Sequence, residues 1–226
     1  MLRVVHTFKE KPMKRFILFL LVLGVGMSLF AQVQLPEHHF AAGSWNFIGD
    51  RLYQNNASAG LAKVNIRIPQ SGPMIYEFNA RYEGGAEDGH GGFGLHIFAN
   101  DVYHGPSWGS GTSYLLWLNY DERPITKGIP AGFSAQVYRS NSNSEMDLVE
   151  SVDLNEFAYL ITEEDLAYPV PFTIWVDGNT GEVRVYDPTD PNMEGYFYLY
   201  LDRKYLPMNG NWISLRTNGM KMSFGY

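Results

Sequence analysis

The sequence predicts an all-β protein, a sandwich of two antiparallel sheets. Roughly ten to twelve short stretches alternate between apolar and polar residues, which is the pattern of strands buried on one face. Gly, Pro, Ser and Asn separate these stretches at regular spacing, as expected of turns. The sequence shows no internal repeat and no interdomain linker, so we expect one domain over residues 32–226.

The first 31 residues have the composition of a secretory signal peptide. Lys14 and Arg15 precede the apolar run FILFLLVLGVGMSLF, and Ala31 is a small residue suited to cleavage before Gln32. Met13 is an alternative start, because MKRF forms a compact basic region. No other stretch is long and apolar enough to cross a bilayer, and the chain has no Cys to carry a lipid or a disulfide. We therefore expect an exported protein, either periplasmic or secreted.

The expected mature chain is strongly acidic. Residues 1–31 hold five of the 17 basic residues and one of the 24 acidic residues, which leaves 12 against 23 and a net charge of −11. Nucleic acids and anionic membrane surfaces both attract proteins through basic patches, and no such patch is visible. We therefore expect neither as a partner, and the acidity favours solubility.

The predicted elements begin after an entry segment at residues 32–44. SWNFIGDRLYQ places a Gly49-Asp50 turn between two short aromatic stretches, which indicates a first hairpin. Residues 61–69 (LAKVNIRIP) and 74–83 (MIYEFNARYE) both alternate, and the turn cluster QSGP joins them.

The middle of the chain, from Gly91 to Tyr138, holds three more alternating segments: GGFGLHIFAN, YLLWLNYDERP and GFSAQVYRS. Successive side chains on a strand point to opposite faces. If the three strands lie in one sheet, one face is core and the other is a polar, aromatic surface. That second surface is the candidate binding face, and it carries His96, Trp117, Asn119, Gln136 and Tyr138.

The last third continues with a predicted strand at 146–154. Thr162, with Asp165 three residues later, resembles a capping box for one short helical turn. FTIWVDGNTGEVRVYD at 172–187 predicts a hairpin, and DPTDPNMEG predicts a long loop. YFYLYLDRKYL and WISLRTNGMKMSFGY close the chain as strands.

The order of these segments is informative about the family. W…GD.L.Q leads to Y.F..R.EGG…DGHGGFGL.IF, then to YLLWL, FTIWVDG..GEVRVY and WISLRTNGMKMSF. This order resembles the concanavalin A-like lectin/glucanase superfamily, close to its laminin-G-like members, over about residues 41–226. The resemblance implies a jelly roll whose concave sheet face and rim loops hold ligands, most often glycans. The resemblance lies in pattern and segment order rather than in a catalytic signature, and it therefore specifies a fold better than an activity.

A non-catalytic glycan-binding module is the first hypothesis. Sugar CH faces stack on aromatic rings and sugar hydroxyls need directional partners, and the candidate face offers both kinds of group. The loop DVYHGPSWGSG adds Tyr103, His104 and Trp108 at the rim. In the alternative interpretation a loop covers Trp117 and Trp175, which then only pack.

A glycoside hydrolase is the alternative function. Glu145, Asp147 and Glu150 fit the E-x-D-x-x-E pattern of retaining laminarinase- and lichenase-type glucanases, in which they would be nucleophile, orienting residue and acid/base. Retention needs two carboxyl groups ~5–5.5 Å apart. A β-bulge between Asp147 and Glu150 is then required, because a regular strand would point Glu150 to the opposite face. The Trp-rich segment that precedes the motif in that family is missing, which favours a protein that is not an enzyme.

Metal binding has a weaker signal. The segment from Glu87 and Asp88 to His90, and the loop from Asp187 to Asp190, place oxygen ligands in Gly- and Pro-rich turns, as a structural calcium site would. Their spacing matches no known calcium loop, and we assign no metal and no cofactor.

Self-association is the remaining alternative. In YFYLYL both faces of the predicted strand are aromatic or apolar, so a second surface must cover it. A neighbouring subunit or another component of a bacterial envelope would provide that cover.

Overall fold

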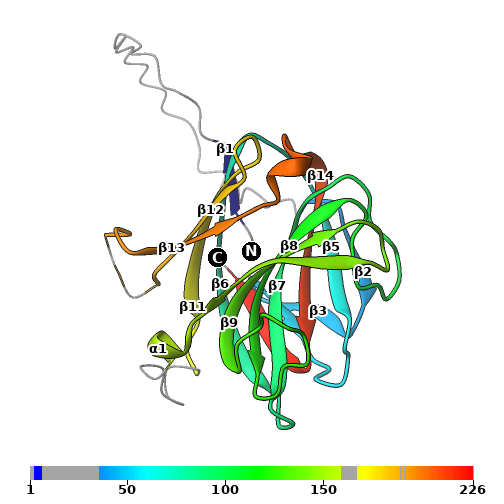
Figure 1. The fold of residues 1–226 in the computed structure, drawn as a ribbon. Coiled ribbons are helices and arrows are strands. Elements are labelled where there is room, and N and C mark those ends of the chain that lie inside the picture. Colours follow the sequence, from blue (N-terminus) through cyan, green and yellow to red (C-terminus); the bar gives the residue numbers. More distant parts are fainter. Residues whose placement is uncertain (1–2, 7–35, 159–166, 189, 191, 226) are drawn as a thin grey trace, which may run out of the picture.

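The computed structural model describes residues 3–6, 36–158, 167–188, 190 and 192–225. These residues form two antiparallel sheets that pack face to face (Figure 1), so the predicted all-β, jelly-roll sandwich is confirmed. Sheet A has eight strands: β1 (Arg3–His6), β3 (Trp45–Ile48), β4 (Arg51–Gln54), β6 (Pro73–Gly85), β11 (Val170–Asp177), β12 (Glu182–Tyr186), β13 (Tyr196–Tyr200) and β15 (Met220–Gly225). Sheet B has seven: β2 (His38–Ala42), β5 (Ala62–Ser71), β7 (His90–Ala99), β8 (Ser113–Asp121), β9 (Gly132–Ser140), β10 (Met146–Asp153) and β14 (Asn209–Asn218).

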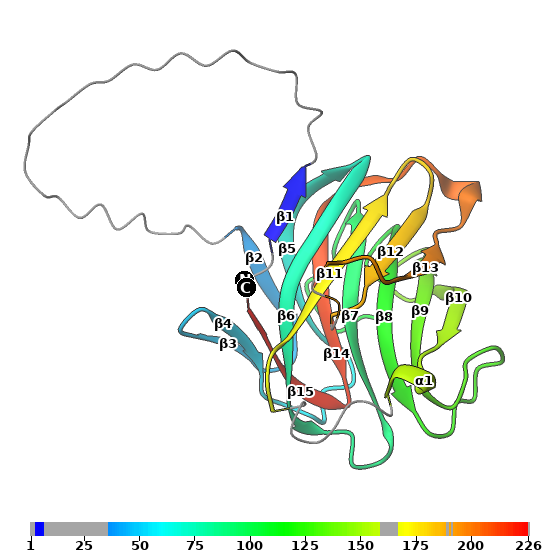
Figure 2. The same ribbon diagram turned by 90° about the vertical axis from the view of Figure 1, so that its left-hand side faces the viewer.

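The strand order separates the chain into two layers. Sheet A runs β13-β12-β11-β6-β15-β4-β3, with β1 also paired to β6, and sheet B runs β10-β9-β8-β7-β14-β5-β2. Figure 2 shows β6, β11 and β12 in front of β7, β8 and β9. Helical structure is limited to α1 (Asn155–Ala158) and a 3-10 turn (Arg203–Tyr205). The predicted capping box at Thr162 and Asp165 lies outside the described residues.

Both predicted hairpins are present. β3 pairs with β4 around the Gly49-Asp50 turn, where Gly49 has a φ of +62°. β11 pairs with β12, with Trp175 opposite Arg184. Glycine suits the first turn because it adopts a positive φ without a steric penalty.

Two segments differ from the sequence prediction. The entry segment contains β2, which pairs with β5 at the edge of sheet B. WISLRTNGMKMSFGY is two strands rather than one, because β14 lies in sheet B and β15 in sheet A. The chain crosses between the sheets at Gly219, which has a φ of +67° and lies so close to the His90 carbonyl that a Cβ would be 2.6 Å from it. A single continuous alternation therefore conceals a change of sheet.

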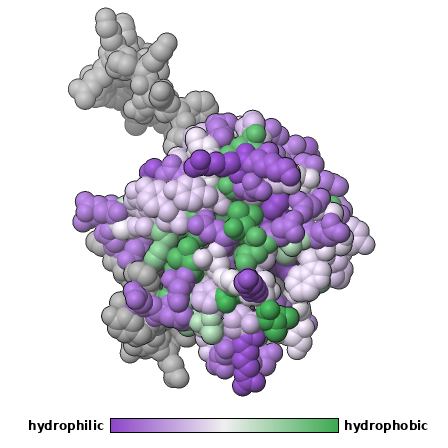
Figure 3. All heavy atoms as spheres, viewed as in Figure 1, coloured by the Kyte–Doolittle hydropathy of each residue, from purple (hydrophilic) through white to green (hydrophobic). Residues whose placement is uncertain are grey.

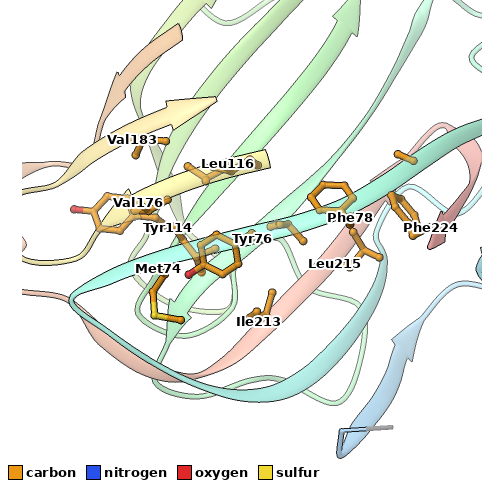
Figure 4. Packing of buried hydrophobic residues seen from close by; sticks show 14 of the residues in the cluster. Met74, Tyr76, Phe78, Tyr114, Leu116, Val176, Val183, Ile213, Leu215 and Phe224 are labelled. Carbon is orange, nitrogen blue, oxygen red and sulfur yellow. The ribbon is translucent and has the colours of Figure 1, made fainter. Parts of the chain in front are cut away.

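The core lies between the two sheets (Figure 4). The predicted apolar faces point inward, and the sticks in Figure 4 show β6 and β11 side chains meeting those of β8 and β14. One polar group inside this core is paired, because the Tyr76 hydroxyl donates to Gln70 Oε1 at 2.7 Å. Burial raises the pKa of Tyr76 well above its usual value, so the phenol stays protonated.

The surface shown in Figure 3 is mostly hydrophilic, with hydrophobic side chains gathered near its middle. No helix in the described part of the chain has the length and apolar character needed to span a membrane.

β1 falls within the predicted signal peptide and pairs with β6, from Arg3 opposite Glu77 to His6 opposite Met74. Residues 7–35 lie outside the description, so the predicted cleavage point stays a prediction.

Candidate functional site

The three middle strands are neighbours in sheet B, as the alternation predicted. Gly94 of β7 lies opposite Trp117 of β8, which lies opposite Gln136 of β9. Their apolar partners, such as Leu116 and Val137, belong to the core. The other side chains therefore lie on the face of sheet B that points away from sheet A, which we call the outer face.

The outer face is covered rather than open. His96 and Gln136 are 0% and 1% exposed, and Trp117 and Asn119 are 8% and 9% exposed. Tyr138 is partly buried. The five predicted face residues are therefore neighbours within one sheet, but none of them forms a freely accessible platform.

The polar groups of this face largely satisfy one another. Trp117 Nε1 donates to Asn119 Oδ1 at 3.0 Å, and the Tyr138 hydroxyl donates to Gln136 Oε1 at 2.7 Å. The Trp117 ring lies over Gly92, where an added Cβ would be 2.6 Å from ring atom Cε2. These contacts fix the orientation of the Trp117 ring.

The segment from residue 100 to residue 112, here the cover loop, joins β7 to β8 and lies on the outer face. It carries the three rim residues that the sequence analysis singled out. Tyr103 and Trp108 are 51% and 53% exposed, and His104 is also exposed. The rim residues therefore meet solvent, while the sheet residues below them do not.

Two side chains of β5 hold the cover loop from below. Lys63 is fully buried, and its Nζ donates to Ser107 Oγ at 2.6 Å and to the Gly109 carbonyl at 2.7 Å. Asn65 Nδ2 donates to the Tyr103 carbonyl at 3.0 Å. Backbone carbonyls of the loop thus face a buried ammonium group and an amide.

Serine hydroxyls and a neighbouring loop complete this attachment. Ser110 and Ser214 share a hydrogen bond of 3.0 Å between their hydroxyl oxygens. The Ser140 hydroxyl accepts from the Ser110 amide at 3.0 Å and donates to the Gly111 carbonyl at 2.9 Å. The Gly109 amide donates to the Asn143 carbonyl at 3.1 Å. Buried hydrogen bonds of this kind rigidify the segment that they hold.

Arg216 of β14 is the central contact of the network. Its guanidinium lies between two indole rings, 5.1 Å from the Trp108 centroid and 5.6 Å from the Trp117 centroid. Nη1 donates to the Trp108 carbonyl, whereas the buried Nε has no partner among the described residues. Register places Arg216 between Gly94 and Lys63. A Cβ at Gly94 would be 2.0 Å from the Leu116 carbonyl oxygen of the neighbouring strand β8.

In this cluster, burial and neighbouring positive charges disfavour protonation of the basic side chains. Burial, and then the positive charge of Arg216, lower the pKa of Lys63 to about 7. Burial lowers the pKa of Arg216 to about 10, so the guanidinium stays charged at neutral pH. Burial, followed by the charges of Lys63 and Arg216, lowers the pKa of His96 well below its usual value, and its Nδ1 is paired with Ser113 Oγ at 3.1 Å.

The residues of the catalytic alternative lie elsewhere. A register shift between Leu148 and Glu150 shows that β10 has the required bulge. It places Glu150 opposite Val137, on the core side of the edge strand, where its carboxylate accepts the Tyr200 amide at 2.6 Å. Asp147 Oδ2 accepts a hydrogen bond from the side-chain Nδ2 of Asn141 at 2.6 Å, and Glu145 lies exposed just before the strand. The structure does not bring Glu150 to the outer face of sheet B.

The candidate metal ligands are engaged in turns. Asp190 accepts the backbone amides of Asn192, Glu194 and Gly195, and these bonds lower its pKa. Asp88 accepts the His90 amide at 3.2 Å. Within the described ranges, no three His, Asp or Glu side chains gather in an arrangement that could hold a metal ion.

The aromatic strand YFYLYL is β13, at the edge of sheet A. Tyr198 and Tyr200 are 44% and 41% exposed and stack with ring centroids 6.3 Å apart. Trp175 lies beneath Arg184, whose guanidinium is 4.7 Å from the indole centroid. This surface keeps the self-association alternative open.

Lys63, Asn65, Ser214 and Arg216 are the site residues that sequence reasoning missed. The sequence does show basic residues at polar positions of two strands in an acidic chain. Basic residues at such positions are ordinarily exposed to solvent, so they did not indicate a buried site.

No protein-family model and no curated protein match the sequence. Similar solved structures include the CBM2 module of the evolved Dit of Lactobacillus casei BL23 phage J-1, with 10% identity, 80% of this chain and 78% of that chain covered, and a TM-score of 0.45. Lectin I-B4 from Griffonia simplicifolia has 14% identity, 87% and 95% coverage and a TM-score of 0.43. The carbohydrate recognition domain of Emp47p has 16% identity, 84% and 87% coverage and a TM-score of 0.41. At these TM-scores the similarities carry no argument about what this chain does.

Proposed function

We propose that this protein is an exported, non-catalytic module that binds glycan through the exposed side of the cover loop. One observation carries the proposal. Trp108 is 53% exposed, while Arg216 lies against its ring at 5.1 Å from beneath. Its indole is therefore accessible to a ligand and held in one orientation.

A fixed aromatic ring is suited to sugars. The CH face of a pyranose packs on an aromatic ring, and the entropy lost on binding is smaller when the ring is already immobile. The buried bonds from Lys63 and Asn65 to the loop backbone immobilise the loop that carries Trp108. Tyr103 and His104 are exposed on the same loop and add hydrogen-bonding groups to it.

The outer-face residues have a supporting role in this proposal. Trp117 is the second ring against the Arg216 guanidinium, and it is 8% exposed. It stacks below the cation rather than against a sugar. In this proposal the outer face of sheet B supports the cover loop and does not itself contact the sugar.

Residues 1–31 direct export in this proposal. Mass spectrometry of the protein recovered from the periplasm or medium of an expressing bacterium is expected to give a mature chain that begins at Gln32. Recovery of the uncleaved chain from the cytoplasm alone would contradict it.

Removal of the Trp108 ring tests the binding surface. We expect Trp108→Ala to weaken binding of a glycan, first identified with the wild-type protein on a glycan array, by at least roughly tenfold, because an aromatic contact is worth about 0.5–1.5 kcal/mol beyond its buried area. Trp108→Phe is expected to retain most of the affinity. Isothermal titration calorimetry measures both.

Tyr168→Ala is the matched control, since Tyr168 is a 62% exposed aromatic residue outside the cover loop. It is expected to bind like the wild type. Equal affinity of Trp108→Ala and the wild type, with both folded by circular dichroism, would rule out this binding surface.

A further inference from the structure

Two basic side chains are buried side by side beneath the cover loop, and no carboxylate of the described residues forms an ion pair with either. Lys63 and Arg216 are opposite each other in the register of β5 and β14, and are 0% and 2% exposed. The ion pairs among the described residues join Arg67 to Glu37, Arg81 to Glu83 and Arg184 to Glu182, and none includes Lys63 or Arg216. In a chain with 24 acidic and 17 basic residues, the absence of an acid here is informative.

Unbalanced buried cations are costly. An ion taken out of water loses several kcal/mol of solvation, which an opposite charge normally offsets. Here the two cations also repel each other, since the charge of Arg216 helps to lower the pKa of Lys63. Among the described residues, the groups that accept hydrogen bonds from the two cations are neutral, namely a hydroxyl and two carbonyls of the cover loop. The ligand-free arrangement therefore lacks the negative charge that would stabilise it.

The guanidinium also has a free side. Nη1 of Arg216 is bonded to the Trp108 carbonyl, but Nε is buried without a partner in the described part of the chain. An arginine binds a carboxylate or sulfate through two parallel N–H donors, and an edge that includes Nε is suited to that geometry. Trp108, the proposed sugar-stacking ring, lies directly against this guanidinium.

We propose that Arg216 and Lys63 form an anion subsite, and that the ligand is an acidic glycan whose carboxylate or sulfate group binds there while its ring stacks on Trp108. The inference rests on the proposed function, because it identifies the class of sugar that the same loop recognises. The anion binds the unpaired Nε edge of Arg216, next to the Lys63 charge. A local shift at Ser107–Gly109 admits it, since both cations are buried, while the bonds of Asn65, Ser110 and Ser140 keep the rest of the cover loop on the sheet.

A matched ligand pair tests the proposal. Calorimetry compares an oligogalacturonate with its methyl-esterified, uncharged form, and a sulfated oligosaccharide with its desulfated form. We expect wild type to prefer one charged form at least tenfold, which also distinguishes carboxylate from sulfate. Lys63→Met and Arg216→Met are expected to lose the preference. Arg67→Met, which removes an exposed arginine from the same strand β5, is expected to keep it.

The outcomes separate this inference from the proposed function. Equal binding of charged and neutral forms by wild type would overturn the anion subsite and leave glycan binding intact. If no glycan binds, the proposed function fails, and the subsite is judged by NMR titration of Lys63 in wild type with sodium galacturonate and with sodium sulfate. A rise in the Lys63 pKa with either anion supports the subsite, and an unchanged pKa overturns it. That measurement needs no variant, so a variant that fails to fold does not block the test.

The free protein should also show the cost of burying Lys63 as a pH dependence. The pKa of Lys63 is about 7 in the folded state and about 10.4 in an unfolded chain, so the unfolded state binds more protons between these values. The buried charge of Lys63 therefore destabilises the folded state most below pH 7. This destabilisation decreases as the pH rises toward 10. Around Lys63, the charged and titratable groups are Arg216 of β14 and His96 of β7, while the cover loop contributes a hydroxyl and a carbonyl.

The comparison is between wild type and Lys63→Met in urea denaturation from pH 6.5 to 9.5. We expect the urea midpoint of wild type to rise with pH relative to the midpoint of the variant. Because both proteins share all other titratable groups, the difference between the midpoints reports on Lys63. A difference between the two midpoints that does not change with pH would contradict the burial of a titrating Lys63.

Discussion

The attachment of the cover loop to the outer face of sheet B depends on one buried contact, the Arg216 guanidinium between Trp108 and Trp117. Trp117 is fixed beneath it by its bond to Asn119, and Trp108 is held above it. Lys63 secures the same loop through the Gly109 carbonyl. Because these groups belong to strands of a rigid sheet, a loop that would otherwise be mobile presents its exposed aromatic ring in a defined place.

In the proposed anion subsite, the same two cations link ligand binding to the stability of the fold. The buried cations hold the loop through neutral acceptors, which is a weaker compensation than a carboxylate would give. A negative ligand group would therefore gain from two basic groups that no carboxylate of the described residues balances, while its sugar ring gains from Trp108. By contrast, Glu150 of β10 accepts the Tyr200 backbone amide across to sheet A.

The sequence was sufficient to predict the two-layer fold, because alternation and turn residues determine which faces are buried. It identified Trp108, Tyr103 and His104 as rim residues, and the structure places all three in solvent. It left two interpretations of the outer face, an open surface or one covered by a loop, because the docking of a loop depends on tertiary contacts that local patterns do not encode. Lys63 was missed for the same reason, since a lysine at a polar strand position is normally solvated.

Amide hydrogen exchange of the cover loop tests the central claim that buried cations fix this loop to the sheet. The amides of Gly109, Ser110 and Gly111 are bonded to Asn143 and Ser140, so they should be protected in the free wild-type protein. In Lys63→Met their exchange should accelerate, while the Gly181 amide of the β11–β12 hairpin should exchange as before. Exchange of the loop amides at the rate of an unstructured peptide in wild type, or no change in the variant, would contradict the account.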